Sequence, residues 1–347
     1  MVWTPEPTRI VRRRWPVAEL HDHAALTRLL DLDQGELAWF ADVHSQARLL
    51  PQRLQHYRWT VHRRPGGVRL VAAPKPRLKE IQRRLLRHVL QPIALHQAAH
   101  GGVRERSVRT MVAPHAGARV LLCADLESFF TSIPGGRIWN LLRIAGLPES
   151  VAYTLTGLMT TVAPDSVIAA NAEHLDRVSR ARLRVPHLPT GAPTSPGLAN
   201  LLCYSLDRRL AGLADRFDAG YTRYVDDLAF SGGAELAARS RRFLQLVAKI
   251  AHAEGFALTE RKSRVMSAST RQALLGTVIN DRPTLERTER DALRAILHNC
   301  ATQGWRTQTR GRTNFADHLR GRIAWAAGID PKLGTQLGAA YDRIDWS

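Results

Sequence analysis

The sequence predicts an α+β protein built on an antiparallel sheet with helices on one side. Three observations lead to this class. The run ARVLLCADLESFF is a short apolar strand that ends at the acidic residue Asp125. The run YTRYVDDLAFSGG has the pattern of two strands joined by a tight hairpin. Helical segments lie between and after these runs, and this order is typical of α+β architecture.

The composition describes a globular protein with a strongly basic surface. The 347 residues are 44% hydrophobic and 23% charged, and the net charge is +19. Such an excess of cations favours binding to polyanions, and nucleic acid is the first candidate. A GC-rich genome would explain a preference for arginine over lysine, but it does not explain the excess itself.

The compartment is predicted from what the sequence lacks. The N-terminal MVWTPEPTRIVRRRW has no apolar signal-peptide core, and no run is long enough to span a membrane. Cys123, Cys203 and Cys300 are far apart and lack zinc spacing, so we interpret them as buried thiols. We therefore expect a cytoplasmic protein without a membrane partner.

The first part of the chain is predicted to combine helices with one hairpin. Apolar positions recur at helical spacing from His23 to Leu50. A basic hairpin follows, with strands at 57–63 and 68–72 and a turn at 65–67. A helix is expected to begin near Arg77, with its cationic residues away from the apolar face.

The middle of the chain carries the strand that ends at Asp125 and then more helices. Helices are expected at 138–145 and 151–160, and 164–185 is interpreted as a variable loop or a short helix. In TGAPTSPGLANLLCYSLDRRL, Ser195 suits a helix N-cap with Pro196 at the first helical position.

The rest of the chain follows the hairpin that contains Asp226 and Asp227. A helix is expected at about 237–254, followed by a strand-like GFALT segment. RQALLGTVIN predicts two short strands around Gly276, and the last sixty residues are mainly helical.

The adjacent aspartates of the hairpin indicate a metal site. If its strands lie beside the strand ending at Asp125, three carboxylates converge, which is costly unless cations bind them. Hard oxygen ligands suit Mg²⁺, and two such ions can activate a 3′-hydroxyl and stabilise a pyrophosphate leaving group. The alternative is that Asp226 and Asp227 form an ordinary polar turn.

Several motifs together resemble those of bacterial retron-type reverse transcriptases. ADLESFF, TGAPTSPGLAN and YVDDLAFS match the three palm motifs in order, and GGVRLVAAPKPRLKEIQ and AAHGGVRERSV resemble the fingers. The resemblance extends to LLGTVINDRP and the C-terminal YDRIDW, and so covers about 31–346. It implies a right-hand polymerase with N-terminal helices and fingers at 1–118, a palm at 119–285 and a helical thumb at 286–347. The palm would contain an insertion at about 137–189.

The resemblance assigns the reaction centre residue by residue. It places Asp125, Leu126, Asp226 and Asp227 at a site for two Mg²⁺ ions, for which Mn²⁺ is a possible substitute. Lys262 resembles the lysine that protonates the leaving pyrophosphate, although an exposed lysine is the simpler interpretation.

The resemblance also assigns substrate contacts. Arg69 would clamp the triphosphate of the incoming dNTP, because its fork matches phosphate oxygens. Phe130 would exclude a 2′-hydroxyl, unless it is a core aromatic like Phe129. The remaining expected substrate contacts are Gly191, Ala192, Ser195 and Tyr224. The expected nucleic-acid contacts are Arg63, Arg64, Lys79, Gly276, Arg310 and Arg312.

Two departures from the retron pattern concern its RNA rather than its chemistry. An Asn usually precedes the histidine of MVAPHAG, whereas Val112, Ala113 and Pro114 precede His115 here. Leu274-Leu275-Gly276 replaces the usual Val-Thr-Gly. Both motifs are associated with the retron lineage and its RNA.

The resemblance implies an RNA-directed DNA polymerase that copies a structured non-coding RNA into cDNA, in anti-phage defence. A host RNase H would remove the template, since little sequence follows Asn280, and a co-encoded effector is a possible partner. One alternative is a stand-alone abortive-infection reverse transcriptase without a retron RNA. Another is an RNA-binding scaffold without catalysis, against which the three aspartates argue.

Overall fold

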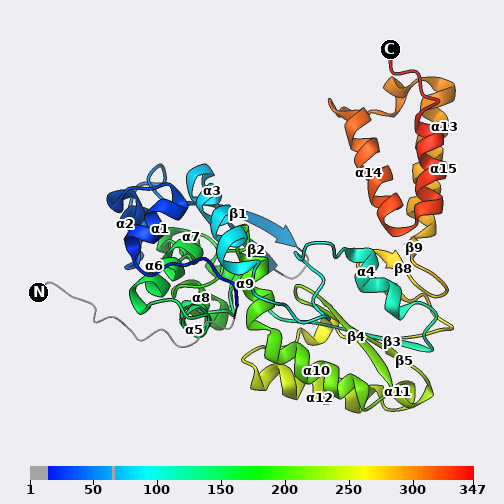
Figure 1. Ribbon diagram of the computed structural model, residues 1–347. Coiled ribbons are helices and arrows are strands. Elements are labelled where there is room, and N and C mark those ends of the chain that lie inside the picture. Colours follow the sequence, from blue (N-terminus) through cyan, green and yellow to red (C-terminus); the bar gives the residue numbers. More distant parts are fainter. Residues whose placement is uncertain (1–14, 65–66) are drawn as a thin grey trace, which may run out of the picture. The chain divides into compact units, whose positions relative to one another are not determined.

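The computed structural model describes residues 15–64 and 67–347 (Figure 1). The chain forms two compact units. The first comprises Met1–Gly102, Leu126–Arg209 and Ile250–Leu258, and the second comprises Val103–Asp125, Leu210–Lys249 and Thr259–Ser347. Among the described residues, no helix has both the length and the apolar character needed to cross a membrane.

The first unit is mainly helical, as the N-terminal periodicity predicts. Asp22 and Asp33 accept backbone hydrogen bonds that begin the first two helices. The α-helices are α1 (His23–Leu30), α2 (Gln34–Ala41), α3 (Pro76–Leu85), α5 (Gly135–Ile144), α6 (Glu149–Met159), α7 (Asp165–Ala169), α8 (Arg177–Leu183) and α9 (Ser195–Leu202). Shorter helical turns are η1 (Gln46–Leu49), η2 (Leu86–Leu90) and η4 (Ala172–His174). The segment 164–185 is thus a set of short helices.

One antiparallel ribbon, the predicted basic hairpin, belongs to the first unit. β1 (Tyr57–Arg64) pairs with β2 (Gly67–Pro74). Part of the predicted turn, residues 65 and 66, lies outside the described residues. Leu70 of β2 packs in a small core with Ile168 and Leu183, which connects the ribbon to α7 and α8.

The second unit contains a four-stranded antiparallel sheet in the order β4-β5-β3-β6. Its strands are β3 (Val120–Asp125), β4 (Ala219–Tyr224), β5 (Asp227–Gly232) and β6 (Arg264–Ser267). The predicted strand at GFALT is wrong, because Leu258 forms only an isolated bridge there. The chain instead makes the helical turn η5 (Glu260–Lys262) and then pairs with β3 through β6.

Both faces of the sheet are covered, so the expectation of helices on one side only is also wrong. On one face, Phe230 of β5 stacks edge-on against Phe243 of α12, with ring centroids 5.0 Å apart. On the other face, Met111 of α4 (Val108–Val112) packs with Cys123 and Ala229. The helix predicted at 237–254 is interrupted at Arg239 and forms α11 (Ala234–Ala238) and α12 (Ser240–Ala253). α10 (Tyr204–Asp215) and α12 each contribute to both units.

A smaller sheet and three helices complete the second unit. The predicted strands around Gly276 form as β7 (Ala273–Leu274) and β8 (Thr277–Val278), and β9 (Thr284–Leu285) adds a third. The last sixty residues are helical, as predicted. They form α13 (Arg287–Gln303), η6 (Trp305–Gln308), α14 (Phe315–Ile329) and α15 (Pro331–Tyr341).

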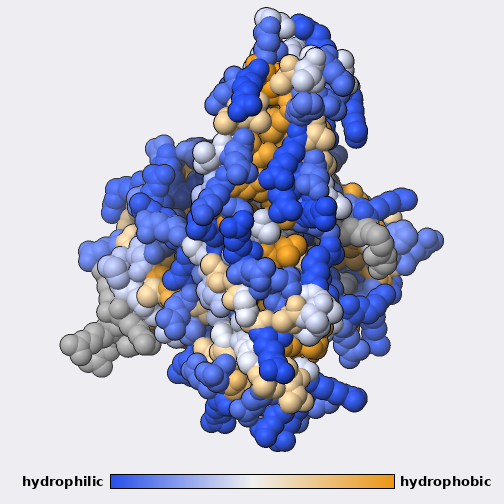
Figure 2. All heavy atoms as spheres, turned by 90° about the vertical axis from the view of Figure 1, so that its right-hand side faces the viewer, coloured by the Kyte–Doolittle hydropathy of each residue, from blue (hydrophilic) through white to orange (hydrophobic). Residues whose placement is uncertain are grey.

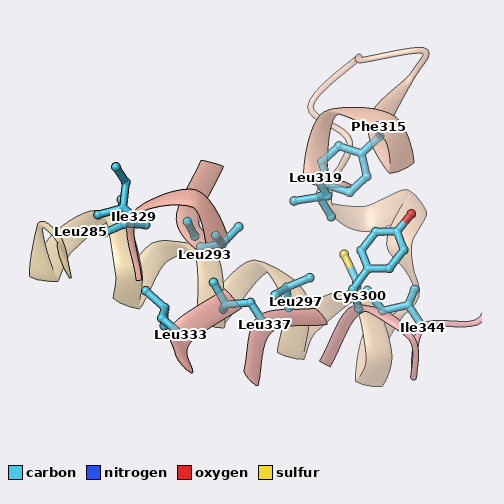
Figure 3. Close-up of a cluster of buried hydrophobic side chains, with 12 residues drawn as sticks. Leu285, Leu293, Leu297, Cys300, Phe315, Leu319, Ile329, Leu333, Leu337 and Ile344 are labelled. Carbon is cyan, nitrogen blue, oxygen red and sulfur yellow. The ribbon is translucent and has the colours of Figure 1, made fainter. Parts of the chain in front are cut away.

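The C-terminal helices have a hydrophobic core of their own (Figure 3). Leu297 of α13 lies beside Leu337 of α15, Cys300 of α13 lies beside Ile344, and Phe315 and Leu319 of α14 belong to the same cluster. Figure 2 shows an apolar stripe on these helices, flanked by hydrophilic residues. The three cysteines are free and buried, as the sequence predicts.

Candidate active site

The two adjacent aspartates lie at a two-residue hairpin turn of the second unit. β4 ends at Tyr224 and β5 begins at Asp227, and these two residues are paired across the turn. Val225 and Asp226 therefore form the turn itself. Asp125, the last residue of β3, is the direct cross-strand partner of Asp227. The predicted convergence of strands is confirmed.

The electrostatics of this strand end are unfavourable without a cation. Asp125 and Asp227 lie directly across from each other on neighbouring strands. Two negative charges in such a cross-strand pair repel and destabilise the pairing. Burial, followed by the negative charges of Asp226 and Asp125, raises the pKa of Asp227 to about 6. The nearby cations Lys262 and Arg264 oppose this shift without cancelling it.

Asp125 is held by two side chains, one at the end of the GFALT segment and one three residues beyond it. Thr259 Oγ1 donates to Asp125 Oδ1 at 2.8 Å, and Lys262 Nζ donates to Asp125 Oδ2 at 2.7 Å. The Thr259 amide also donates to the Asp125 carbonyl at 2.8 Å. The sequence indicated Lys262 but missed Thr259 and Arg264. A polar residue at the end of the strand-like GFALT segment was the signal that could have identified Thr259 as part of the site.

The carboxylates fit a divalent cation by their chemistry. In the described part of the chain, no group of three or more His, Cys, Asp or Glu side chains is arranged so that it could hold a metal ion. The hard oxygens of Asp125, Asp226 and Asp227 are nevertheless the donors that Mg²⁺ prefers. A cation would also relieve the repulsion that raises the pKa of Asp227. The Leu126 side chain is apolar and buried, so only its main-chain carbonyl suits a metal.

A buried histidine connects the two strands of the hairpin. His115 Nδ1 and Nε2 each lie 2.7 Å from a hydroxyl, that of Ser231 on β5 and that of Thr222 on β4. Thr222 in turn donates to the Met111 carbonyl at 3.1 Å. The histidine of the altered MVAPHAG motif therefore supports the sheet that carries the aspartates.

Two further predicted residues belong to the same unit. Tyr224 is half-buried and packs against the cluster that contains Met111 and Cys123. Gly276 has φ +75° and forms, with Leu275, the turn between β7 and β8. Gly276 is therefore a turn residue, which is consistent with the predicted hairpin.

In the first unit, the TGAPTSP segment is joined to the strand that carries Arg69. Thr190 Oγ1 accepts from the Ala72 amide and donates to the Leu70 carbonyl, both at 3.1 Å. Gly191 donates to the Ala72 carbonyl at 3.0 Å, and a Cβ at Gly191 would lie 2.9 Å from that oxygen. This close approach requires glycine.

The predicted N-cap at Ser195 is wrong by one residue. Thr194 is the N-cap of α9, and Ser195 is its first residue. Ser195 Oγ is buried and donates to the Pro189 carbonyl at 2.6 Å, so the hydroxyl closes the preceding turn instead of capping the helix. Ala192 is buried in the same segment.

Phe129 and Phe130 differ in burial. Phe129 is 4% exposed and packs on Phe256 with a centroid distance of 5.6 Å, so it is a core residue. Phe130 is only half-buried, although its ring lies 5.5 Å from that of Phe129. The structure thus distinguishes the two rings, as the sequence suggested.

The cationic residues predicted to contact the triphosphate or the nucleic acid are exposed wherever their side chains are described. Arg69 of β2 and Arg63 of β1 are exposed, as is Lys79 of α3. Arg64 ends β1, but its side chain lies outside the described part. Arg310 and Arg312 are exposed in the segment between η6 and α14.

Comparison with known proteins gives one family. The model described as "Reverse transcriptase (RNA-dependent DNA polymerase)" matches residues 61–279. The Retron Mx162 reverse transcriptase of Myxococcus xanthus is 38% identical, over 95% of this chain and 68% of that protein. The Retron Mx65 reverse transcriptase of the same organism is also 38% identical, over 96% of this chain and 74% of that protein. The Retron Ec86 reverse transcriptase of Escherichia coli is 26% identical, over 80% and 77%.

Proposed function

The chain belongs to the bacterial retron-type reverse transcriptases, and we propose that Asp125, Asp226 and Asp227 form its catalytic centre. The observation that carries this proposal is the cross-strand pair of Asp125 and Asp227 beside Asp226. Three carboxylates at one strand end, with the pKa of Asp227 raised to about 6, form a site that needs cations.

The family generally uses divalent metal ions. We propose Mg²⁺, with Mn²⁺ as a substitute, held by the three carboxylates and the Leu126 carbonyl. When bound, two ions would activate the primer 3′-hydroxyl and stabilise the departing pyrophosphate. The Lys262 ammonium, which is 58% exposed, holds Asp125 in place and is available to protonate that pyrophosphate.

Replacing Asp226 by Asn tests the catalytic centre. Loss of one metal-binding charge should lower Mg²⁺-dependent extension of a primed RNA template by at least about a thousandfold. RNA affinity should stay within about twofold, because a single carboxylate contributes little to phosphate binding. Asp218→Asn is the matched control, since it removes an exposed charge just before β4. Unchanged extension by the Asp226 variant would refute the assignment.

We propose that the ribbon and the TGAPTSP segment receive the incoming nucleotide. Arg69 would bind the triphosphate, and Gly191, Ala192 and Ser195 would shape the floor beneath the base pair. Tyr224 would contact the substrate from the hairpin. The exposed position of Arg69 and the bonds from Thr190 to β2 support this arrangement.

Phe130 is proposed to select deoxyribonucleotides by steric exclusion. Its ring is half-buried, unlike that of Phe129, and is therefore accessible to a sugar. Phe130→Val should raise incorporation of ribonucleotides relative to deoxyribonucleotides by about tenfold or more. Phe129→Leu is the control and should change stability instead. An unchanged ratio in an active Phe130 variant would place the sugar gate elsewhere.

We propose the polymerase division of fingers at 1–118, palm at 119–285 and thumb at 286–347. The insertion at about 137–189 belongs to the fingers side. The core of α13, α14 and α15, which also includes Leu285 of β9, supports a boundary close to 285. Limited proteolysis of the native protein should cut near residue 285. Protection of that site, together with cleavage inside α13, α14 or α15, would refute the boundary.

We propose that the template is a structured non-coding RNA that becomes joined to its cDNA, in anti-phage defence. Arg63, Arg64, Lys79, Gly276, Arg310 and Arg312 would contact this nucleic acid. Host RNase H would remove the copied RNA, and a co-encoded effector would act with the complex in the cytoplasm. Sequencing of co-purified nucleic acid tests this proposal. Unrelated cellular RNA without attached cDNA would favour the stand-alone defence enzyme.

A further inference from the structure

A buried arginine stands two residues before the turn between β4 and β5 and is hydrogen-bonded to it. Arg223 of β4 has 0% of its surface exposed. Its Nη1 donates to the Val225 carbonyl at 2.9 Å. Arginine stays charged in proteins, and burying a charge is costly unless its donors are hydrogen-bonded. Burying the Arg223 guanidinium therefore costs free energy, and the hydrogen bond to the turn offsets part of that cost.

The turn itself is in a conformation that its sequence disfavours. Val225 has φ +57°, whereas Asp226 is not among the residues with positive φ. A two-residue hairpin loop with positive φ only at its first position is of type II′, which favours glycine there. Valine is β-branched and pays a steric penalty at positive φ. Val225 therefore needs support from outside the turn.

The Arg223 contact supplies that support at the decisive peptide bond. Type II and type II′ turns are mirror images and place the central peptide in opposite orientations. The Val225 carbonyl and the Asp226 amide belong to this central peptide. A donor that binds the Val225 carbonyl therefore fixes the orientation of the central peptide, and with it the orientation of Asp226.

We infer that Arg223 is a positioning residue that clamps the strained Val225 turn and so orients Asp226 for catalysis. The inference rests on the proposed catalytic role of Asp226. Arg223 acts through the peptide and does not itself touch the substrate. Lysine would be a poor replacement, because its single ammonium lacks the planar fork of arginine.

A double-mutant cycle between the two positions tests the clamp. Arg223→Gln should lower kcat for single-nucleotide addition at least tenfold, while the dNTP KM and the RNA Kd stay within threefold. Val225→Gly alone should leave kcat within threefold, because glycine accepts positive φ and the clamp remains. Added to Arg223→Gln, Val225→Gly should restore kcat at least fivefold, since the turn no longer needs support.

Arg137→Gln is the matched control. Arg137 Nη1 also donates to a backbone carbonyl, that of Glu254 at 3.1 Å, but away from the hairpin. This variant should lose thermal stability without a loss of kcat, and Val225→Gly should not rescue it. If Arg223→Gln does not fold, Arg223→Lys carries the same predictions.

The clamp is overturned if Val225→Gly changes kcat by the same factor with and without Arg223, or if Arg223→Gln retains full kcat. An inactive native protein would refute the proposed function instead. In that case the double-mutant cycle is measured by melting temperature instead of kcat. Val225→Gly should then raise the melting temperature of the Arg223→Gln variant more than that of the native protein. Equal shifts in the two backgrounds would then overturn the clamp.

Discussion

The second unit has two hairpins with two-residue turns, and these turns are stabilised in different ways. Val225 and Leu275 each occupy the first turn position with positive φ, +57° and +49°. In the β7–β8 turn, the second residue is Gly276, also at positive φ, so local turn chemistry suffices. In the β4–β5 turn, the second residue is Asp226, and the support comes from Arg223.

The difference shows that a turn without glycine depends on contacts from outside the turn. A third turn, Arg310-Gly311, has positive φ at both positions, +47° and +79°, like Leu275-Gly276. In both of these turns a glycine occupies the second position, and the turn needs no further support there. The β4–β5 turn has no glycine, only Val225 has positive φ there, and a side chain from outside the turn contacts the Val225 carbonyl. Three variants can break or sharpen this contrast.

His115→Ala should have the largest effect on stability. It would leave a cavity and remove one hydrogen-bond partner from each of the Thr222 and Ser231 hydroxyls, lowering the free energy of unfolding by about 2–4 kcal/mol. His298→Ala, at an exposed position of α13, should change it by less than about 0.5 kcal/mol. Urea unfolding measures both values. Equal values for the two variants would mean that the β4–β5 hairpin needs no support from His115.

Gly276→Ala should have an intermediate effect. A Cβ there meets no atom within 4 Å, so the cost is only the positive φ, about 1–2 kcal/mol. Gly328→Ala in α14 also meets no atom within 4 Å, but there alanine should stabilise the helix by about 0.5–1 kcal/mol. The two changes should thus shift the melting temperature in opposite directions. Shifts of the same sign would contradict the role given to Gly276.

Arg310→Gln combined with Arg312→Gln should affect stability least. Both side chains are exposed, so the melting temperature should stay unchanged. If both bind phosphates, the log–log slope of RNA affinity against salt should fall by about 1.4, along with the number of nucleotides added per binding event. The rate of single-nucleotide addition should be retained. An unaltered slope and processivity would identify a merely solvated surface.

Much of the fold follows from local patterns. The strand ending at Asp125, the hairpin at Asp226 and Asp227 and the C-terminal helices were all predictable from periodicity and turn residues. The errors occurred where the outcome depended on a distant partner. GFALT has the composition of a strand, yet β6 is the strand that pairs with β3. Ser195 suits an N-cap, yet its hydroxyl bonds Pro189 instead.

The candidate site divides in the same way. The sequence by itself determined which carboxylates lie at strand ends, because alternation and turn chemistry act over a few residues. Only the tertiary structure decided that Lys262 and Thr259 hold Asp125, 137 and 134 residues away along the chain. The same is true of His115, whose partners on β4 and β5 are more than a hundred residues distant. Such contacts depend on how strands are ordered in the sheet, and no local pattern in one sequence records that order.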